Sequence, residues 1–362
     1  MSHKIPCLIG DIGGTNARFT LILVTSNPEE NPEEIETKYW ETFQFPSVKS
    51  VFDNFLEKYQ NTDKYPQFGV FGVASPVKNN TLLQFVNIPH WIPTNGDELA
   101  KELKMKKIVF MNDYAANGYG IQTKLIEGKD YLWVIKQEID PNGTKLTFGA
   151  GTGLGFGYCV KDPHSPHYIV CDSQGGRQDY VSKNDLQYAL MAYLAKYYGV
   201  DHVSVERASC GQSLIPIYQF LKDYEKIEPE PTLYAKLKDF HETSMSDNYS
   251  ALNKELVQKG LKEECPLCKR TLELFVEIYG GVCGNFSTLM MPYGGIYILG
   301  GLSVALEPII VKKGIFMKAY GDKGRIKPFL DQMPIMIITV HDIAIRGLRE
   351  YCRRLVEEDE KK

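Results

Sequence analysis

Two glycine-rich segments carry the residue types that phosphate chemistry needs. GDIGGT, at residues 10–15, follows an apolar run and joins Asp11 to two glycines and a threonine. GAGTGLG, at residues 149–155, offers backbone and hydroxyl donors without a charge. Glycines let peptide N–H groups approach phosphate oxygens closely, and Mg²⁺ favours a carboxylate together with water and phosphate. Two such turns facing each other could hold a nucleoside triphosphate from both sides.

A glycine-rich turn between strands has two other interpretations. It can be a tight hairpin without a function, or the strand-to-helix turn of a dinucleotide site. The dinucleotide interpretation fails because the chain continues after GDIGGT as ARFTLIL, which is the pattern of a strand. An acid at the strand end and a second Gly-Thr-Gly turn favour phosphate binding over a plain hairpin.

The two glycine-rich segments belong to a repeated pattern of elements. Residues 8–21 and 146–159 each read as an apolar run, a glycine-rich turn and a second run, which predicts two β-hairpins. A third strand, a helix and further strands follow each hairpin, and a closing helix begins near Ile343. The repetition predicts a duplicated α/β protein with two lobes around a cleft. We expect a small lobe from 1–111 plus 343–362 and a large lobe from 112–342, with a helical insertion near 222–262.

Composition limits the classes of function. The chain has 362 residues, of which 43% are apolar and 24% charged, and its net charge is −4. This balance argues against nucleic acid or an anionic membrane as the main partner. The start, MSHKIPCLIGD, enters a strand-like run at once, so we expect no signal peptide and a cytoplasmic protein with eight reduced cysteines. Cys265 and Cys268 form a C-x-x-C that we interpret as two thiols in the first turn of a packed helix.

The motifs, in this order, resemble those of the bacterial-type glucokinases, whose superfamily includes hexokinases, actin and the heat-shock chaperone ATPases. GDIGGTNARF and GAGTGLGFG are similar to the family's two phosphate motifs, and GGIYILGG to its adenosine motif. VFMNDYAANGYGI is similar to the strand and helix that carry the catalytic acid, and FGVASPV with VNIPHW to two sugar-side segments. The resemblance spans nearly the whole chain and implies a duplicated actin-like ATPase (ribonuclease H-like) fold.

The resemblance also implies an activity, ATP-dependent phosphorylation of glucose at its 6-hydroxyl, in a cytoplasmic homodimer. Asp113 would be the general base, and Asp11 would hold Mg²⁺, through water. The implied ATP-binding residues are Asp11, Gly13, Gly14, Thr15, Asn16, Gly151, Thr152, Gly153, Gly300 and Gly301. The implied sugar-binding residues are Asn112, Asp113, Gln174, Arg177, Glu206 and Asn87. Without the motif series, Asn112–Asp113 would read as a turn or helix cap and Glu206–Arg207 as a solvated pair.

The segment SQGGRQDY departs from the family pattern, which has Glu-Gly-Gly-His here. Gln174 stands in place of the glutamate and Arg177 in place of the histidine. The pocket could still take glucose, prefer mannose, fructose or an amino sugar, or bind sugar weakly, and Arg177 could turn to pair with Glu206 or Asp179. A nucleotide-binding sugar sensor with weak kinase activity is the alternative from another class. Asn112–Asp113 and Glu206 argue against it, because a sensor needs no base directed at a hydroxyl.

Overall fold

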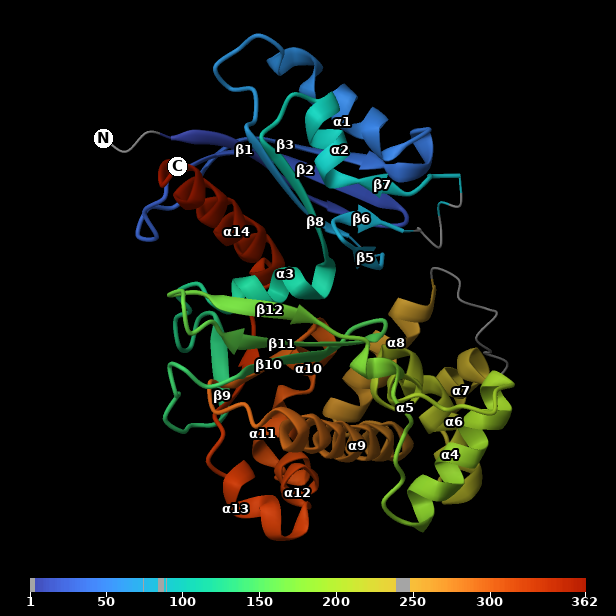
Figure 1. Cartoon of the computed structure of the whole chain (residues 1–362). Helices are drawn as coiled ribbons and strands as arrows, with labels where there is room; N and C mark the ends of the chain where they lie inside the picture. The colour runs from blue at the N-terminus through green and yellow to red at the C-terminus, as the bar shows by residue number, and fades with distance from the viewer. Residues whose placement is uncertain (1–3, 74, 84–87, 89, 239–247) are drawn as a thin grey trace. The chain divides into compact units, whose positions relative to one another are not determined.

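Two mixed β-sheets of the same topology form the framework of the protein (Figure 1), one in unit 1 and one in unit 2 except for the end of its edge strand, Val170–Asp172, which belongs to unit 1. The structure is a computed structural model that describes residues 4–73, 75–83, 88, 90–238 and 248–362. Unit 1 comprises Met1–Leu125, Val170–Asp172 and His341–Lys362, and unit 2 comprises Ile126–Ile169 and Ser173–Val340. The lobe boundaries inferred from the sequence stay a prediction.

The sheet of unit 1 has the strand order β3-β2-β1-β4-β8. Its first three strands are antiparallel neighbours, whereas β1, β4 and β8 run parallel. The carboxyl ends of the parallel strands therefore meet at one edge, where Gly72 is opposite Asp11 and Val73 is opposite Asn112. The bounds are β1 Ile5–Ile12, β2 Asn16–Val24, β3 Glu33–Glu41, β4 Phe68–Val73 and β8 Lys107–Asn112.

Helices cover both faces of this sheet, so its central strands are apolar on both sides. Along β1, Leu8 and Ile12 point into one core with α1 and α2, whereas Cys7 and Ile9 point into the other with α3 and α14. The period of two in a strand produces this alternation. The helices are α1 Val48–Leu56, α2 Gly96–Glu102, α3 Asp113–Gly120 and α14 Ile343–Glu360. A small separate sheet contains β5 Val77–Lys78, β6 Thr81–Leu82 and β7 Thr94–Asn95.

Helices α3 and α14 pack so closely that two glycines are required at their contact. A Cβ atom at Gly347 of α14 would collide with the carbonyl oxygen of Ala116, and one at Gly120 of α3 would collide with that of Ile343. Arg354 of α14 adds a hydrogen bond of 2.8 Å to Gln122, just beyond α3. The closing helix thus fixes the helix that begins with Asp113.

The sheet of unit 2 repeats the topology, with the order β12-β11-β10-β13-β14-β9. Strands β10 and β11 are an antiparallel hairpin, and β10, β13 and β14 run parallel. Strand β9 pairs antiparallel with β14 and is an addition that the sequence pattern did not predict. The bounds are β9 Tyr131–Ile135, β10 Lys145–Ala150, β11 Leu154–Lys161, β12 Tyr168–Asp172, β13 Ile296–Leu299 and β14 Ile335–Ile338.

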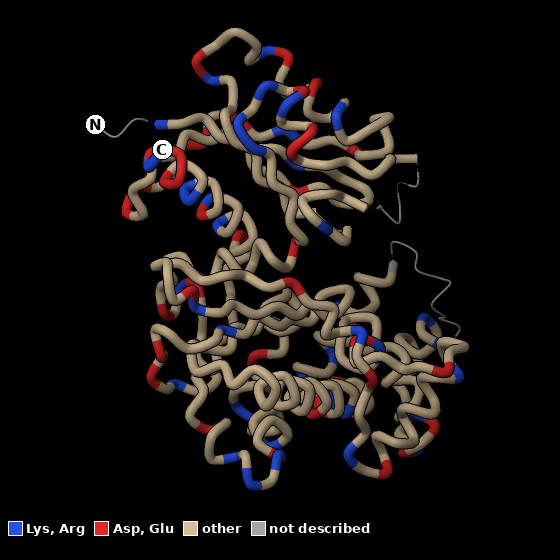
Figure 2. The backbone as a smooth tube through the Cα atoms, viewed as in Figure 1, with Lys and Arg blue, Asp and Glu red and all other residues tan. Residues whose placement is uncertain are grey.

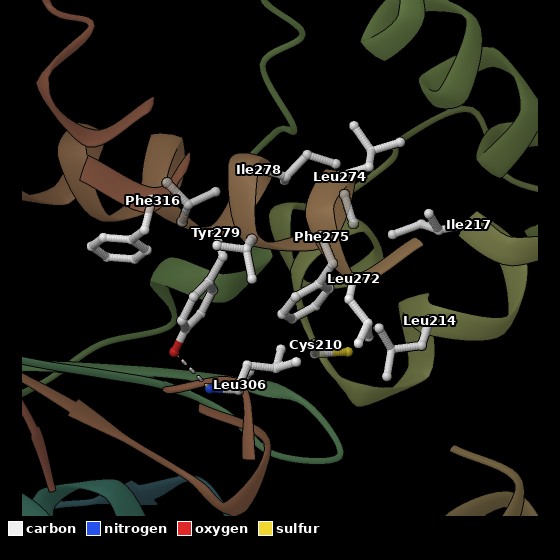
Figure 3. Close-up of a cluster of buried hydrophobic side chains, with 14 of the residues drawn as sticks. Cys210, Leu214, Ile217, Leu272, Leu274, Phe275, Ile278, Tyr279, Leu306 and Phe316 are labelled. Carbon is white, nitrogen blue, oxygen red and sulfur yellow. Dashed lines mark hydrogen bonds between the residues drawn. The ribbon is translucent and has the colours of Figure 1, made fainter. Parts of the chain in front are cut away.

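The core of unit 2 is built around the long helix α9, Pro266–Met290. Figure 3 shows Phe275 and Tyr279 of α9 packed among Leu214, Ile217, Leu306 and Phe316. The surrounding helices are α4 Asp185–Tyr198, α5 Val205–Ser209, α6 Leu214–Tyr224, α7 Pro231–Leu237, α8 Asn248–Leu261, α10 Gly301–Ala305, α11 Glu307–Lys312, α12 Ile315–Gly321 and α13 Lys327–Leu330. Within the segment read as a helical insertion, the structure describes α7 and α8.

The two cysteines of the C-x-x-C motif are buried at the start of α9. Cys265 is the N-cap residue, and its sulfur accepts a hydrogen bond of 3.3 Å from the N–H of Cys268. Both residues are buried in the core at the N-terminus of this helix, so the interpretation as a packed helix start is confirmed. In the described ranges, no helix combines the length and apolar character that crossing a bilayer would need.

Gly347→Ala tests the close contact between α14 and α3. The added methyl group must separate the two helices, and overpacking of this kind costs about 1–3 kcal/mol. We expect the free energy of unfolding, measured in urea, to fall by that amount. Glu358→Ala, at an exposed position of α14, is the matched control and should change it by less than about 0.5 kcal/mol. Equal stability of the two variants would contradict the tight contact.

Candidate active site

In unit 1, Asp11 lies at the carboxyl end of β1, beside Gly72 of β4 and opposite Arg18 of β2. A Cβ atom at Gly72 would lie 3.9 Å from the Asp11 carboxylate and 3.8 Å from the Cα atom of Asp113, so this glycine lies between the two acids. The pKa of Asp11 is raised to about 6, because restricted hydration and the negative charge of Asp113 together outweigh the opposing effect of Arg18. Asp11 is open to solvent nevertheless. It can therefore accept a cation.

The first glycine-rich turn closes the hairpin between β1 and β2. The N–H of Gly13 donates to the carbonyl oxygen of Asn16 at 2.9 Å, and the carbonyl oxygen of Thr15 accepts a hydrogen bond of 2.8 Å from the N–H of Thr42. Thr15 and Asn16 are exposed, and Gly14 is half-buried. The turn is thus anchored at both ends while its outer surface stays accessible to a ligand.

Asp113 is the first residue of α3 and follows directly on β8. The N–H of Tyr114 donates to Asn112 Oδ1 and to Asp113 Oδ1, both at 2.9 Å, so Asn112 caps the helix. Restricted hydration raises the pKa of Asp113, and the hydrogen bond from Tyr114 opposes that rise. A carboxylate with a raised pKa is a stronger base, which is what removal of a proton from a hydroxyl requires.

In unit 2, the second glycine-rich turn joins β10 to β11. Ala150 pairs with Leu154, and the N–H of Gly151 donates to the carbonyl oxygen of Gly153 at 2.8 Å. Gly300, between β13 and α10, has a φ of 95° and lies so close to Ala150 that a Cβ atom would collide with the Ala150 carbonyl oxygen. The parallel pairing of β10 with β13 therefore brings Gly300 and Gly301 beside this turn.

A buried tyrosine supports the turn from below. The N–H of Ala150 donates to the hydroxyl of Tyr279 at 3.2 Å, a contact drawn as a dashed line in Figure 3. The same hydroxyl is 2.8 Å from that of Ser303 in α10, which donates to the carbonyl oxygen of Leu299 at 2.9 Å. This chain ties the glycine turn and the start of α10 to the core helix α9.

Glu206, in α5, connects two turns of unit 2. One carboxylate oxygen accepts a hydrogen bond of 3.0 Å from the N–H of Leu154, and the other is 2.8 Å from Arg177 Nη1. A Cβ atom at Gly153 would lie 2.5 Å from this carboxylate, so the glycine makes room for it. The Glu206 side chain is only 16% exposed, which makes its two partners necessary. Of the two partners that the sequence left open for Arg177, the structure forms the pair with Glu206.

A single helical turn, η3 at Gly175–Arg177, begins after Gln174 and ends with Arg177. A Cβ atom at Gly175 would lie 2.8 Å from the ring of Phe156, and one at Gly176 would collide with the carbonyl oxygen of Leu154. The glycine pair thus lets this turn pack directly on β11, and Gln174 stays exposed. Asp179 pairs with His202 at 2.7 Å.

Helix α8 reaches the second glycine turn through Gly211. The N–H of Gly211 donates to the carbonyl oxygen of Gly151 at 2.8 Å. The carbonyl oxygen of Gly211 in turn accepts hydrogen bonds from the Tyr249 hydroxyl at 2.8 Å and from Asn253 Nδ2 at 2.9 Å. The segment read as an insertion therefore supports the turn predicted to bind phosphate.

The expected residues form two sets. Unit 1 brings together the turn of Gly13, Gly14, Thr15 and Asn16 with Asp11, Asn112 and Asp113, and unit 2 brings together Gly151, Thr152, Gly153, Gln174, Arg177, Glu206, Gly300 and Gly301. Asn87 lies outside the described residues. Sequence reasoning missed Gly72, Gly211, Tyr249, Asn253, Tyr279 and Ser303. The ASCG segment that follows Glu206 was a possible signal for Gly211, whereas no pattern marks the others.

The family-specific motifs extend along the chain, and a family model described as Glucokinase matches residues 8–355. The chain belongs to the glucokinase family. It is 32% identical to a glucokinase of Nostoc sp. over 356 residues, which cover 96% of this chain and 99% of that protein. A glucokinase of Synechocystis sp. is 30% identical over 353 residues, covering 94% of this chain and 96% of its own length.

Solved structures of glucokinases share the fold. The crystal structure of a glucokinase from an Antarctic psychrotroph superimposes with a TM-score of 0.76 at 21% identity, covering 97% of this chain and 99% of that one. A Balamuthia mandrillaris glucokinase, solved in complex with glucose, has a TM-score of 0.70 at 15% identity and covers 97% and 94%. The predicted duplicated actin-like ATPase fold is confirmed, and so is a sugar-kinase family.

Asp11→Asn should stabilise the ligand-free protein at neutral pH. The pKa of Asp11 is raised from 3.8 to about 6, so between these values the folded protein holds a proton that the unfolded chain has released. Stability therefore falls as the pH rises through this window, and removal of the carboxylate restores it. We expect a gain of about 1 kcal/mol at pH 7.5, because solvent screens an exposed group.

Urea unfolding at pH 7.5 and at pH 4 measures this effect. The Asp11→Asn variant and the unsubstituted protein should differ at pH 7.5 and differ much less at pH 4, where Asp11 of the folded protein is protonated. Asp63→Asn, at an exposed aspartate, is the control and should change neither value. A variant less stable than the unsubstituted protein at pH 7.5 would contradict the raised pKa.

Proposed function

We propose that this glucokinase-family chain transfers the γ-phosphate of ATP to the 6-hydroxyl of glucose. The observation that carries the proposal is the Asp113 carboxylate directly after β8, which is solvent-accessible and has a raised pKa, with only the strand β4 between β8 and the β1 strand of Asp11. The relatives in the family bear the name glucokinase, which supports glucose as the acceptor.

Asp113 acts as the general base in this proposal. An alcohol is hardly ionised at neutral pH, so a positioned carboxylate takes the proton as the 6-hydroxyl attacks phosphorus. Asn112, which precedes it, caps α3 with its side-chain oxygen, and its side-chain amide donates a hydrogen bond to the Asp113 carboxylate. In this proposal, the second N–H of that amide donates to a sugar hydroxyl. The cap fixes the geometry of both residues, because rotation of either side chain would leave the N–H of Tyr114 with one acceptor fewer.

ATP and Mg²⁺ would be held by the strand ends and the two glycine turns. Asp11 would hold Mg²⁺ through water, and the ion would neutralise charge on the phosphates. Asp11 fits this role, because its surroundings disfavour the charged carboxylate and raise its pKa, and a nearby cation would stabilise that charge. The residues proposed to contact ATP are Gly13, Gly14, Thr15, Asn16, Gly151, Thr152, Gly153, Gly300 and Gly301.

The sugar would contact Asn112, Asp113, Gln174, Arg177, Glu206 and Asn87. A second candidate function, phosphorylation of another hexose, is favoured by one observation. Arg177 Nη1 is 2.8 Å from Glu206, so one carboxylate oxygen that the family uses for a sugar hydroxyl already has a cationic partner. A sugar bound beside this ion pair can therefore have its hydroxyl groups arranged differently from those of glucose. We further propose that the protein is a cytoplasmic homodimer. Light scattering of the purified protein measures its molar mass and thereby tests the dimer.

Asp113→Asn should abolish most of the turnover while both substrates still bind. The side chain stays nearly isosteric, whereas the proton acceptor is lost, so we expect kcat to fall by about 10²–10⁴-fold. A coupled assay of ADP release with glucose measures kcat, and Asp53→Asn on α1 is the control. Retention of more than about a tenth of kcat, which corresponds to ~1.4 kcal/mol, would show that Asp113 is not the base.

Gln174→Glu combined with Arg177→His tests the sugar pocket. The double variant restores an acidic acceptor and removes the arginine that pairs with Glu206, so KM for glucose should fall by about one hydrogen-bond increment, ~1 kcal/mol or several-fold. Gln174→Glu alone keeps the arginine and should change KM less, because a second carboxylate near Glu206 opposes it. KM values for glucose, mannose and fructose are measured for both variants. Unchanged values for all three sugars would place these residues outside the sugar site.

A further inference from the structure

The second glycine-rich turn can bind phosphate only through uncharged donors of its own. Its sequence, GAGTGLG, contains no charged residue, and the strands of the unit 2 sheet are mostly tan, that is uncharged, in Figure 2. Without a cation in the turn, the direction of each peptide N–H group decides whether that group can reach a phosphate oxygen. The contacts that set these directions are therefore part of any nucleotide site that the turn forms.

Two neighbouring N–H groups of the turn, those of Thr152 and Gly153, have no acceptor among the residues that the structure describes. Thr152 is exposed and Gly153 is half-buried, so a ligand can approach this side of the turn from solvent. These two groups are therefore the backbone donors that the turn can offer to a phosphate. The N–H groups on either side have acceptors within unit 2, which are the Tyr279 hydroxyl for Ala150, the carbonyl oxygen of Gly153 for Gly151 and the Glu206 carboxylate for Leu154.

One hydrogen bond from outside the turn orients the peptide that carries the Thr152 N–H. The C=O of Gly151 and the N–H of Thr152 belong to the same planar trans peptide, so they point in opposite directions. The N–H of Gly211 donates to this Gly151 carbonyl oxygen at 2.8 Å. A Cβ atom at Gly211 would lie 2.8 Å from the same oxygen, so the contact requires glycine. Gly211 therefore sets the direction of the Thr152 N–H.

Helix α8 in turn fixes Gly211. The carbonyl oxygen of Gly211 accepts hydrogen bonds from the Tyr249 hydroxyl at 2.8 Å and from Asn253 Nδ2 at 2.9 Å. A carbonyl oxygen has two lone pairs, so these two donors complete its hydrogen bonding. Tyr249 and Asn253 are one helical turn apart and therefore lie on the same side of α8.

Helix α8 is itself packed tightly on the core helix α9. Leu256 and Val257 of α8 are buried in the same core cluster as the apolar side chains of α9. Gly260 allows the two helices to approach closely, because a Cβ atom there would lie 2.7 Å from Leu272 and 3.0 Å from the carbonyl oxygen of Cys268. Helix α8 therefore gives Gly211 a firm support.

The fold alone gives no reason for an asparagine at position 253. The Oδ1 atom of Asn253 is buried and has no hydrogen-bond donor among the described residues. A buried acceptor without a donor costs stability, and asparagine is a poorer helix former than leucine. An apolar side chain would suit the stability of α8 better, so the contact between Asn253 Nδ2 and Gly211 is what this asparagine contributes.

We propose that Tyr249 and Asn253 are positioning residues for the nucleotide, which act through Gly211 to direct the Thr152 N–H at a phosphate oxygen of ATP. This inference rests on the proposed kinase function and deepens it, because neither side chain belongs to the residues predicted to touch ATP or sugar. Loss of either donor lets Gly211 move, and the peptide that joins Gly151 to Thr152 moves with it. The hydrogen bond from that peptide to a charged oxygen then weakens.

Asn253→Leu separates a positioning role from a structural one. The variant removes the donor to Gly211 together with the buried acceptor that lacks a donor, so its melting temperature should not fall. Its Kd for ATP in the presence of Mg²⁺ should nevertheless rise about tenfold, as expected for one hydrogen bond to a charged group. Calorimetric titration measures this Kd and that for glucose, which should change less than about twofold. An unchanged Kd for ATP would overturn the proposal.

Tyr249→Phe removes the second donor and keeps the aromatic ring, so it should also raise Kd for ATP several-fold. Tyr320→Phe is the matched control, because the buried Tyr320 hydroxyl likewise donates to a backbone carbonyl oxygen, that of Leu330 at 3.2 Å. The control should keep Kd for ATP within about twofold of the unsubstituted protein, even where both variants lose stability. Equal Kd values for the two variants would contradict a specific role of Tyr249.

Gly211→Ala tests whether Asn253 acts through Gly211. The added methyl group must displace the Gly151 carbonyl oxygen, so we expect Kd for ATP to rise at least about tenfold. Two changes that act through one peptide are not additive, so adding Asn253→Leu to Gly211→Ala should weaken ATP binding by less than a further twofold or so. A further loss of about tenfold would show independent effects and would overturn the relay through Gly211.

The unsubstituted protein distinguishes failure of this inference from failure of the proposed function. If it binds ATP and releases ADP with glucose, while Asn253→Leu binds ATP equally well, the kinase function stands and the positioning role is overturned. If the unsubstituted protein binds no ATP, the proposed function fails and the positioning role fails with it.

Discussion

The carboxylate of Glu206 is the contact on which the candidate site of unit 2 depends. It bridges the N–H of Leu154, at the end of the second glycine turn, and the guanidinium of Arg177, at the end of η3. A largely buried carboxylate is stable only with such partners, so the two turns and α5 stabilise one another. This arrangement requires glycine at positions 153, 175 and 176. A side chain at Gly153 would collide with the Glu206 carboxylate, and one at Gly175 or Gly176 would collide with β11.

Much of this architecture could be predicted from the sequence. The hairpins around residues 8–21 and 146–159, the strands that follow them and the closing helix at Ile343 all have the periodicity of their elements. Asp11 and Asp113 stand at strand ends, and parallel neighbours carry such residues to one edge of a sheet. Local pattern and sheet topology are therefore sufficient for the framework and for the two acids.

Other features depend on contacts between residues far apart in sequence. The hydroxyl of Tyr279 and the amide of Asn253 support the second glycine turn from helices whose patterns report only burial. The partner of Arg177 stayed open between Glu206 and Asp179 because both lie within reach along the chain, and only the packing of α5 beside β11 decides it. Strand β9 was missed because YLWVI is a short apolar run among turns, and its partner strand β14 lies far later in the sequence.

The pairing of α3 with α14 affects how the protein is made. Helix α14 follows nearly all of unit 2 in the sequence, yet it covers the face of the unit 1 sheet to which Cys7 and Ile9 of β1 point. During synthesis the ribosome therefore releases β1, β4 and α3 long before the helix that buries them, and their apolar face must wait for it. Unit 2 has no such delay, since its sheet and core helices emerge before α14. A chain shortened by an early stop codon before α14 would keep the second unit's core intact and expose the apolar side chains of β1, β4 and α3 that α14 covers, which form the kind of surface that chaperones bind.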